Sequence, residues 1–126
     1  MPSQQMSDVA IKELDWYLRD HLFRQSNAGK DRFRKESLPG EMAALYLRYR
    51  NADLQQLSQL ANIVIEGLVA KKVVEQDGNE LRMPGKLVRL QCAKCFYINY
   101  LAGAEQRACL RCQHAELRDF PPKKKA

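Results

Sequence analysis

The four cysteines of this 126-residue chain form two C-x2-C pairs, Cys92 with Cys95 and Cys109 with Cys112, and thirteen residues separate the pairs. Each pair places two thiolates on one tight turn, a geometry suited to two corners of a Zn²⁺ tetrahedron. The intervening residues are long enough for a β-hairpin that folds the second pair back onto the first. Because a site closed by four thiolates has no open position for water, the spacing predicts a structural zinc ion rather than a catalytic one.

Two alternatives compete with a four-cysteine zinc site. His114 lies two residues beyond Cys112 and is the nearest rival ligand, but we expect it to be exposed or to lie just outside the ligand sphere. A redox-active C-x2-C pair would lie at the start of a helix, whereas strand-like residues flank both pairs here. In a reducing compartment, paired C-x2-C motifs indicate metal ligands rather than disulfides. The sequence therefore favours metal binding by all four cysteines.

Residues 87–120 follow the order strand, C-x2-C, strand, loop, C-x2-C, strand, and this order resembles a zinc ribbon. The segments that carry the resemblance are LVRLQCAKC, FYINYLAG and ACLRCQHAELRDF. The resemblance implies a small β module whose cysteine pairs lie on two facing knuckles. Two features depart from the family. Phe96 and Gln113 follow the second cysteine of each pair, where many ribbons have a glycine with positive φ, and the gap of thirteen residues is short.

The net charge of +6 is concentrated at the C-terminal end of the chain. Residues 1–85 carry 12 Lys and Arg against 12 Asp and Glu, whereas residues 86–126 carry 9 against 3. Four thiolates binding Zn²⁺ would subtract two charges and leave this end positive. A basic surface at one end indicates a polyanionic partner, most often nucleic acid, although a lysine tail can also serve solubility alone.

Basic side chains in three segments are candidates for phosphate contacts. One segment is the connector expected at 30–36, where Phe33 lies between cations in KDRFRK; the others are the cysteine pairs and the C-terminal lysines. For each segment the alternative is an ordinary solvated surface. Near the cysteines, Phe96, Tyr97 or Tyr100 could stack on a base, although we expect at least half of these rings to cover the small core. The candidate contacts are Arg32, Arg34, Lys35, Lys94, Arg107, Arg111, Lys123, Lys124 and Lys125.

The first fifty residues predict two helices. Apolar residues recur at helical spacing after Ser7 and Asp8, so we expect a helix from there to about Gln25, with Gly29 ending it. Pro39 suits the first turn of a second helix. The buried stripe of this second helix would consist of Met42, Leu45, Tyr46 and Tyr49.

From residue 53 to residue 72, apolar residues keep helical spacing without a break, and Asp53 is a plausible cap. Two interpretations stay open here: one long helix, or two shorter helices hinged near Ala61 and Asn62. Further along, Asp77 and Gly78 separate two short strand-like runs, which predicts a β-hairpin.

Residues 51–84, NADLQQLSQLANIVIEGLVAKKVVEQDGNELRMP, resemble a winged helix–turn–helix with the hairpin as its wing. The resemblance implies that Ile63–Lys72 takes the recognition-helix position. The charges argue against ordinary groove recognition, because residues 53–83 carry five acidic and three basic side chains. The early residues of that helix are also apolar and offer little to phosphates or base edges. The region could therefore contact a protein instead.

Together these features predict an α+β protein in three parts. A helical, winged-helix-like domain would span residues 7–84, a small β zinc ribbon 87–120, and a basic flexible tail 121–126. We expect a small zinc-binding regulator of the transcription type that associates with nucleic acid, DNA rather than RNA. The alternative is an adaptor whose ribbon docks onto a larger machine such as a polymerase, ribosome or secretion complex. A protein partner or a second copy could bind through the helical domain.

Other classes of function have little support. The chain has no Gly-rich phosphate loop, no nucleophile motif and no Cys/His pair outside the metal set, so we expect neither an enzyme nor a small-molecule substrate. His21, beside Asp20, is expected to be a partly exposed helix residue. No apolar run approaches the length of a membrane span, and the first residues do not resemble a secretory signal. We therefore expect a cytoplasmic protein, or a nuclear one in a eukaryote.

Overall fold

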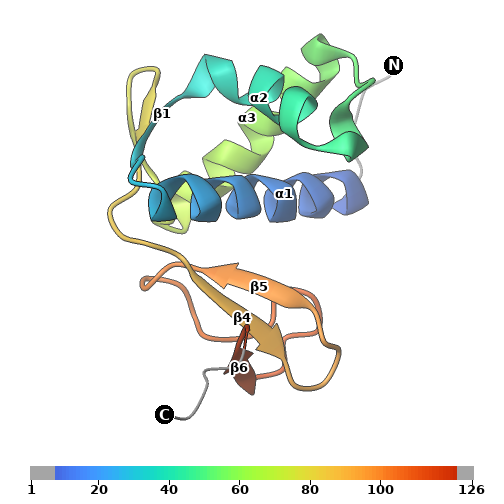
Figure 1. The fold of residues 1–126 in the computed structure, drawn as a ribbon, viewed down its shortest axis with the longest axis vertical. Helices are drawn as coiled ribbons and strands as arrows, with labels where there is room; N and C mark the ends of the chain where they lie inside the picture. The colour runs from blue at the N-terminus through green and yellow to red at the C-terminus, as the bar shows by residue number, and fades with distance from the viewer. Residues whose placement is uncertain (1–7, 122–126) are drawn as a thin grey trace.

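The computed structural model describes residues 8–121 and has an α+β fold (Figure 1). Three helices and a small sheet come first, and a β region that carries the four cysteines follows. The predicted fold class is therefore confirmed. Lys123, Lys124 and Lys125, and all of the expected tail beyond Pro121, lie outside the described residues.

Residues 8–83, which we call the helical region, contain three α-helices, two 3-10 turns and three short strands. In order these are α1 (Asp8–Asn27), β1 (Arg32–Arg34), η1 (Lys35–Ser37), α2 (Leu38–Leu45), η2 (Leu47–Tyr49), α3 (Leu54–Ala70), β2 (Glu75–Asp77) and β3 (Glu80–Arg82). The three strands form an antiparallel sheet in the order β1-β3-β2.

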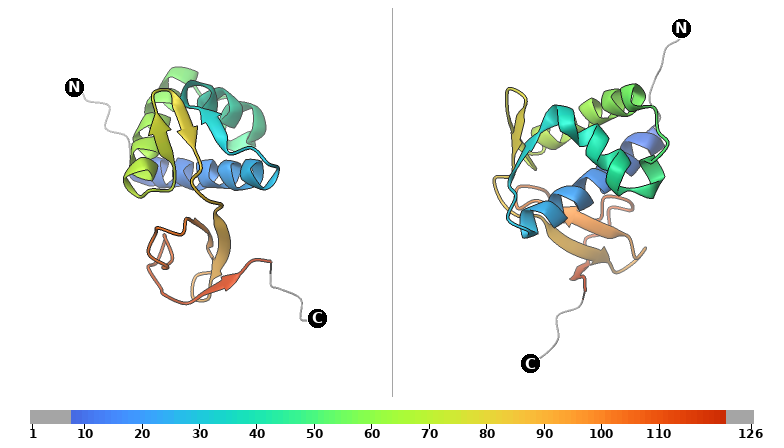
Figure 2. Two further views of the ribbon diagram at one scale, coloured as in Figure 1. Left: turned by 90° about the vertical axis from the view of Figure 1, so that its left-hand side faces the viewer. Right: turned by 45° about the horizontal axis from the view of Figure 1, so that its top comes forward.

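Residues 87–120, which we call the C-terminal β region, form a second antiparallel sheet. Its strands are β4 (Val88–Cys92), β5 (Ile98–Leu101) and β6 (Leu117–Asp119), in the order β5-β4-β6. This sheet lies on the opposite side of α1 from α2 and the β2–β3 hairpin (Figures 1 and 2). None of the described helices is long and apolar enough to cross a membrane.

α1 contacts the rest of the protein on two of its faces. One face carries Leu14, Leu18 and Leu22, which are fully buried in the core shared with α2 and α3. The other face carries aromatic and polar side chains that meet β5, which the apolar periodicity alone did not predict. His21 is likewise 2% exposed and bonds to Glu41 at 2.9 Å, so the expected partial exposure of this residue was wrong.

α3 is one unbroken helix, which decides between the two interpretations of residues 53–72. The carboxylate of Asp53 caps it by accepting hydrogen bonds from the backbone N–H groups of Gln55 and Gln56. The alternative with a hinge near Ala61 and Asn62 is excluded, and Ala61 belongs to the buried stripe of the continuous helix. The segment that begins at Ile63 is therefore not a separate helix, because Ile63 lies inside α3, which begins nine residues earlier at Leu54.

The segment 30–36 was expected to be a loop, but its middle is strand β1. Phe33 is 2% exposed and packs in the core, while Arg32 and Arg34 on either side of it are exposed. Strand pairing with β3 fixes this alternation, because Phe33 lies opposite the buried Leu81. Three residues with one apolar side chain were too few to show the alternation of buried and exposed residues that is typical of a strand.

The other local predictions were mostly correct. β2 and β3 form the expected hairpin, and Gly78 takes the positive φ, 60°, that its turn needs. Gly29, with φ 98°, follows the end of α1 in the same way. Leu45 was expected in the buried stripe but is 59% exposed, because α2 ends there and the backbone becomes extended at Tyr46.

Candidate metal centre

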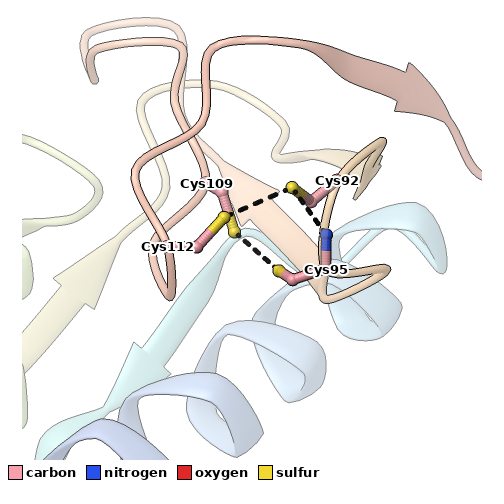
Figure 3. A group of neighbouring side chains, drawn as sticks. All are labelled: Cys92, Cys95, Cys109 and Cys112. Atoms are coloured by element: carbon pink, nitrogen blue, oxygen red, sulfur yellow. Dashed lines mark hydrogen bonds between the residues drawn. The ribbon is translucent and has the colours of Figure 1, made fainter.

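The four cysteine sulfurs form one cluster at the end of the C-terminal β region (Figure 3). The Sγ atoms all lie within 4.8 Å of one another; Cys92 and Cys112 are 3.5 Å apart, and Cys95 and Cys109 are 3.6 Å apart. A tetrahedral zinc ion with Zn–S bonds of about 2.3 Å holds its sulfurs about 3.8 Å from one another. The cluster therefore has the size of a tetrahedral four-thiolate site.

Each C-x2-C pair forms a compact turn, and we call residues 92–96 the first knuckle and 109–113 the second. In the first, the Cys92 sulfur accepts backbone N–H bonds from Lys94 at 3.3 Å and Cys95 at 3.4 Å. The N–H of Phe96 closes the turn by donating to the Cys92 carbonyl at 3.0 Å. The two N–H bonds to its sulfur favour the thiolate form of Cys92.

The second knuckle repeats the first. The Cys109 sulfur accepts the backbone N–H of Arg111 at 3.4 Å, and the Gln113 N–H donates to the Cys109 carbonyl at 2.9 Å. The residue after each second cysteine has a left-handed backbone, with φ 65° at Phe96 and 67° at Gln113. The knuckles therefore keep the geometry that usually uses glycine, and strain of about 1 kcal/mol or more is stored at each position.

Asn99 on β5 contacts the cluster through the second knuckle, and this contact was not predicted from the sequence. Its side chain is fully buried, and its Nδ2 lies 3.6 Å from the Cys109 sulfur and 3.2 Å from the Tyr97 carbonyl. Its Oδ1 accepts the backbone N–H of Leu110 at 2.8 Å. Asn99 thus fixes the second knuckle at the sulfur and at the backbone. A polar residue between Ile98 and Tyr100 in a strand was the only signal in the sequence.

The four thiols differ in how readily they ionise. Burial alone would raise the pKa of Cys109, but hydrogen bonds from the backbone N–H groups of Cys112 and Arg111 and from Asn99 outweigh it and lower the pKa to about 6. At Cys95 a backbone hydrogen bond from Tyr97 favours the thiolate, yet burial and the neighbouring sulfurs raise the pKa to about 12. Four thiolates this close therefore need a bound cation to ionise together.

His114 does not join the cluster, in line with the expectation that it lies outside the ligand set. Its backbone carbonyl instead accepts the N–H of Cys109 at 2.9 Å. The four cysteines could hold a metal ion such as zinc, because soft thiolates in a tetrahedral set favour that ion. An ion bound by all four cysteines would have no open position for water.

The predicted nucleic-acid contacts that the structure describes lie in two different regions. Lys94, Arg107 and Arg111 are exposed in the C-terminal β region, and the Arg111 guanidinium lies 6.0 Å from the centre of the Tyr97 ring. Of the nearby aromatic residues, Tyr100 is buried and Phe96 is 68% exposed.

The other basic candidates with a described position belong to the helical region. Arg32 and Arg34 share the exposed face of the β1-β3-β2 sheet with acidic residues, and Arg32 lies 3.8 Å from Glu80. Lys35 is half-buried in η1. These three cations therefore belong to a surface of mixed charge, not to a purely basic patch.

Comparisons of the chain with protein-family models, with curated proteins and with solved structures gave no match. What the cluster can do therefore follows from its own chemistry: four convergent thiolates can bind one metal ion and hold the two knuckles together.

Proposed function

We propose that this chain is a zinc-dependent DNA-binding protein of the transcription-regulator type, in which α3 enters the major groove. In this proposal the four cysteines bind a structural Zn²⁺, and residues 87–120 form a zinc ribbon. The helical region acts as a winged helix–turn–helix, with α2 as the first helix and α3 as the recognition helix.

The topology of the helical region supports the winged-helix assignment. The order helix, strand, helix, helix, strand, strand, with a sheet in the order β1-β3-β2, places a two-stranded hairpin directly after α3. One feature departs from a compact helix–turn–helix, since the connection from Leu45 to Leu54 contains the 3-10 turn η2. The likeness therefore extends beyond residues 51–84 to α1, β1 and α2.

A stripe of amide side chains on α3 is the observation that carries the proposal. Gln55, Gln59 and Asn62 recur at intervals of four and three residues, are all exposed, and lie opposite the buried face of the helix. Glu66 continues the same stripe one turn later. Asn and Gln can bond the N6 and N7 atoms of adenine in the major groove, and Glu can accept from the N4 amine of cytosine. Because α3 begins at Leu54, these residues belong to the candidate recognition helix.

Cations near both ends of α3 could contact the DNA backbone. Arg50 is exposed just before the helix, and Lys71 and Lys72 are exposed just after it. The hairpin is a poorer phosphate contact because Glu75, Asp77 and Glu80 are exposed on it. The proposal therefore assigns base recognition to α3 and phosphate contacts to the cations that flank it.

Binding to duplex DNA tests this proposal directly. A preferred sequence would first be selected from random duplexes with the zinc-loaded protein, and its affinity measured across a range of salt concentrations. Replacing Gln59 or Asn62 by Ala should weaken binding to the selected sequence by about 1–3 kcal/mol with little effect on unrelated duplexes. Replacing Lys71 and Lys72 by Gln should instead weaken binding to all duplexes and reduce the salt dependence.

The matched control is Gln106→Ala, which removes an exposed amide from the C-terminal β region and not from the stripe on α3. It should leave duplex affinity unchanged. Duplex binding that does not depend on salt, or equal effects of Gln59→Ala and Gln106→Ala, would contradict the proposal.

An adaptor function is the second candidate, and exposed leucines around the α2–α3 connection favour it. Leu45, Leu47 and Leu54 are 59%, 78% and 54% exposed. Apolar side chains that are exposed together in this way are typical of a surface that contacts another protein. An adaptor would bring down a stoichiometric protein partner in the presence of nucleases. Leu47→Asp should abolish that association and leave duplex binding intact. Gln59→Ala should weaken duplex binding and leave the association with the partner intact.

A further inference from the structure

Phe96, at the end of the first knuckle, is an exposed aromatic residue on a rigid support. Its side chain is 68% exposed, whereas Tyr100, four residues later, is 2% exposed in the core. Hydrogen bonds hold the Phe96 backbone on both sides: its N–H donates to the Cys92 carbonyl at 3.0 Å, and its carbonyl accepts from the Gln91 side chain at 3.1 Å. The first knuckle, which carries Cys92 and Cys95, therefore holds the backbone from which the Phe96 ring projects.

The backbone at Phe96 makes this exposed ring unusual. A φ of 65° favours glycine, and a bulky side chain there costs stability. The exposed ring offsets little of that cost by packing, because most of it faces solvent. Gln113 occupies the equivalent strained position in the second knuckle but presents a polar side chain. The ring of Phe96 thus adds nothing that the knuckle needs for its own folding, which suggests a role in binding another molecule.

The surroundings of Phe96 carry positive charge. Lys94 is exposed two residues earlier in the same knuckle, and Arg111 is exposed on the facing knuckle beside the ring of Tyr97. Two acidic side chains of the C-terminal β region are already paired, Glu105 with Arg19 and Glu116 with Arg118. An exposed aromatic face next to cations matches the chemistry of an unpaired base with its phosphates.

We propose that the first knuckle binds single-stranded nucleic acid. Phe96 stacks on an unpaired base, while Lys94 and Arg111 contact the adjacent phosphates. Stacking on an exposed aromatic tolerates different bases, so this surface has little sequence preference. It is separate from the amide stripe of α3, and the proposal does not depend on duplex recognition by that helix.

The test measures binding of a short fluorescent oligothymidylate, and of a duplex of the same length, to the full zinc-loaded chain by anisotropy. Phe96→Gly should reduce affinity for the single strand by about tenfold, leave duplex affinity unchanged, and leave thermal stability unchanged or higher, since the backbone strain is relieved. Phe96→Trp should restore single-strand binding. Replacing Lys94 and Arg111 by Gln should reduce the slope of log affinity against log salt by about 1.4.

Gln113→Gly is the matched control, because it relieves the same backbone strain in the other knuckle and removes no aromatic ring. It should bind the oligothymidylate like the unaltered chain. The proposal is overturned if the unaltered chain does not bind the single strand, or if Phe96→Gly binds it equally well. It is also overturned if the variant loses only self-association in sedimentation, since the ring would then contact protein. Duplex binding that is unaffected in the α3 variants would contradict the proposed function and leave this inference standing.

Discussion

Arg19 in the middle of α1 and Glu105 in the loop after β5 form a two-bond ion pair that joins the two halves of the protein. The guanidinium nitrogens lie 2.7 and 2.8 Å from the two carboxylate oxygens, and the side chains are 0% and 6% exposed. Arg19 also donates to the Tyr100 carbonyl and to Asp15. Although burial alone would raise the pKa of Glu105, hydrogen bonds from Arg19 and from the Ala102 N–H lower it. The sheet that carries the cysteine cluster is thereby held on α1.

Removing this guanidinium should destabilise the whole chain. Arg19→Met leaves the buried carboxylate of Glu105 without its cation, and breaking a buried pair in this way costs about 3–5 kcal/mol. Chemical denaturation of the zinc-loaded protein would measure the loss. Arg118→Met, which breaks the exposed pair with Glu116, should cost less than about 1 kcal/mol. Equal losses in the two variants would show that the Arg19 pair does not join the two regions.

Metal content gives the most direct test of the cysteine cluster. We expect one zinc ion per chain by elemental analysis, and cobalt(II) in its place should show the absorption of tetrahedral thiolate coordination. Chelation should unfold residues 87–120, because removing the ion breaks the four metal–sulfur bonds that hold the two knuckles together. Cys112→Ser should lower zinc retention, whereas Ala115→Ser, an exposed change in the same loop, should not. A metal-free chain with an intact β region would contradict the assignment.

Gln113→Gly should stabilise the protein, which few substitutions by glycine do. Gln113 has φ 67°, and relief of its left-handed strain outweighs the extra freedom of glycine in the unfolded chain, for a net gain of about 0.5–1 kcal/mol. Thermal unfolding with saturating zinc would detect the gain. Gln106→Gly provides the comparison, because residue 106 is not among the residues with positive φ, and it should be neutral or slightly destabilising. A loss of stability in Gln113→Gly would refute the strain argument.

Asn99 should control how tightly the metal is held. Asn99→Leu removes the donor to the Cys109 sulfur and leaves the partly buried N–H of Leu110 without its acceptor. We expect a loss of about 1–3 kcal/mol in stability and a fall of about tenfold or more in metal affinity. Competition with a chromogenic chelator would measure the affinity. Asn79→Leu, on the exposed hairpin, should leave zinc affinity unchanged. An Asn99→Leu variant that retains zinc normally would exclude this supporting role.

Local features were predictable because they depend on residues that are close in the chain. The four-cysteine cluster follows from the C-x2-C spacing, which already brings two sulfurs onto one turn. The β2–β3 hairpin follows from Asp77 and Gly78. Gly29 predicts the end of α1, and Pro39 predicts the start of α2. In each case one or two neighbouring residues determine the backbone.

Other features depended on partners that are far away in the sequence. The charged segment Arg32–Arg34 becomes a strand only when it pairs with β3, where Phe33 lies opposite Leu81. Arg19 meets Glu105 across 86 residues, and Asn99 meets the Cys109 sulfur only when the second knuckle folds over β5. Residue types and spacing alone thus determined which side chains form the cysteine cluster. The tertiary structure decided which polar side chains are buried beside it, because desolvation and hydrogen bonding depend on what packs around each group in three dimensions.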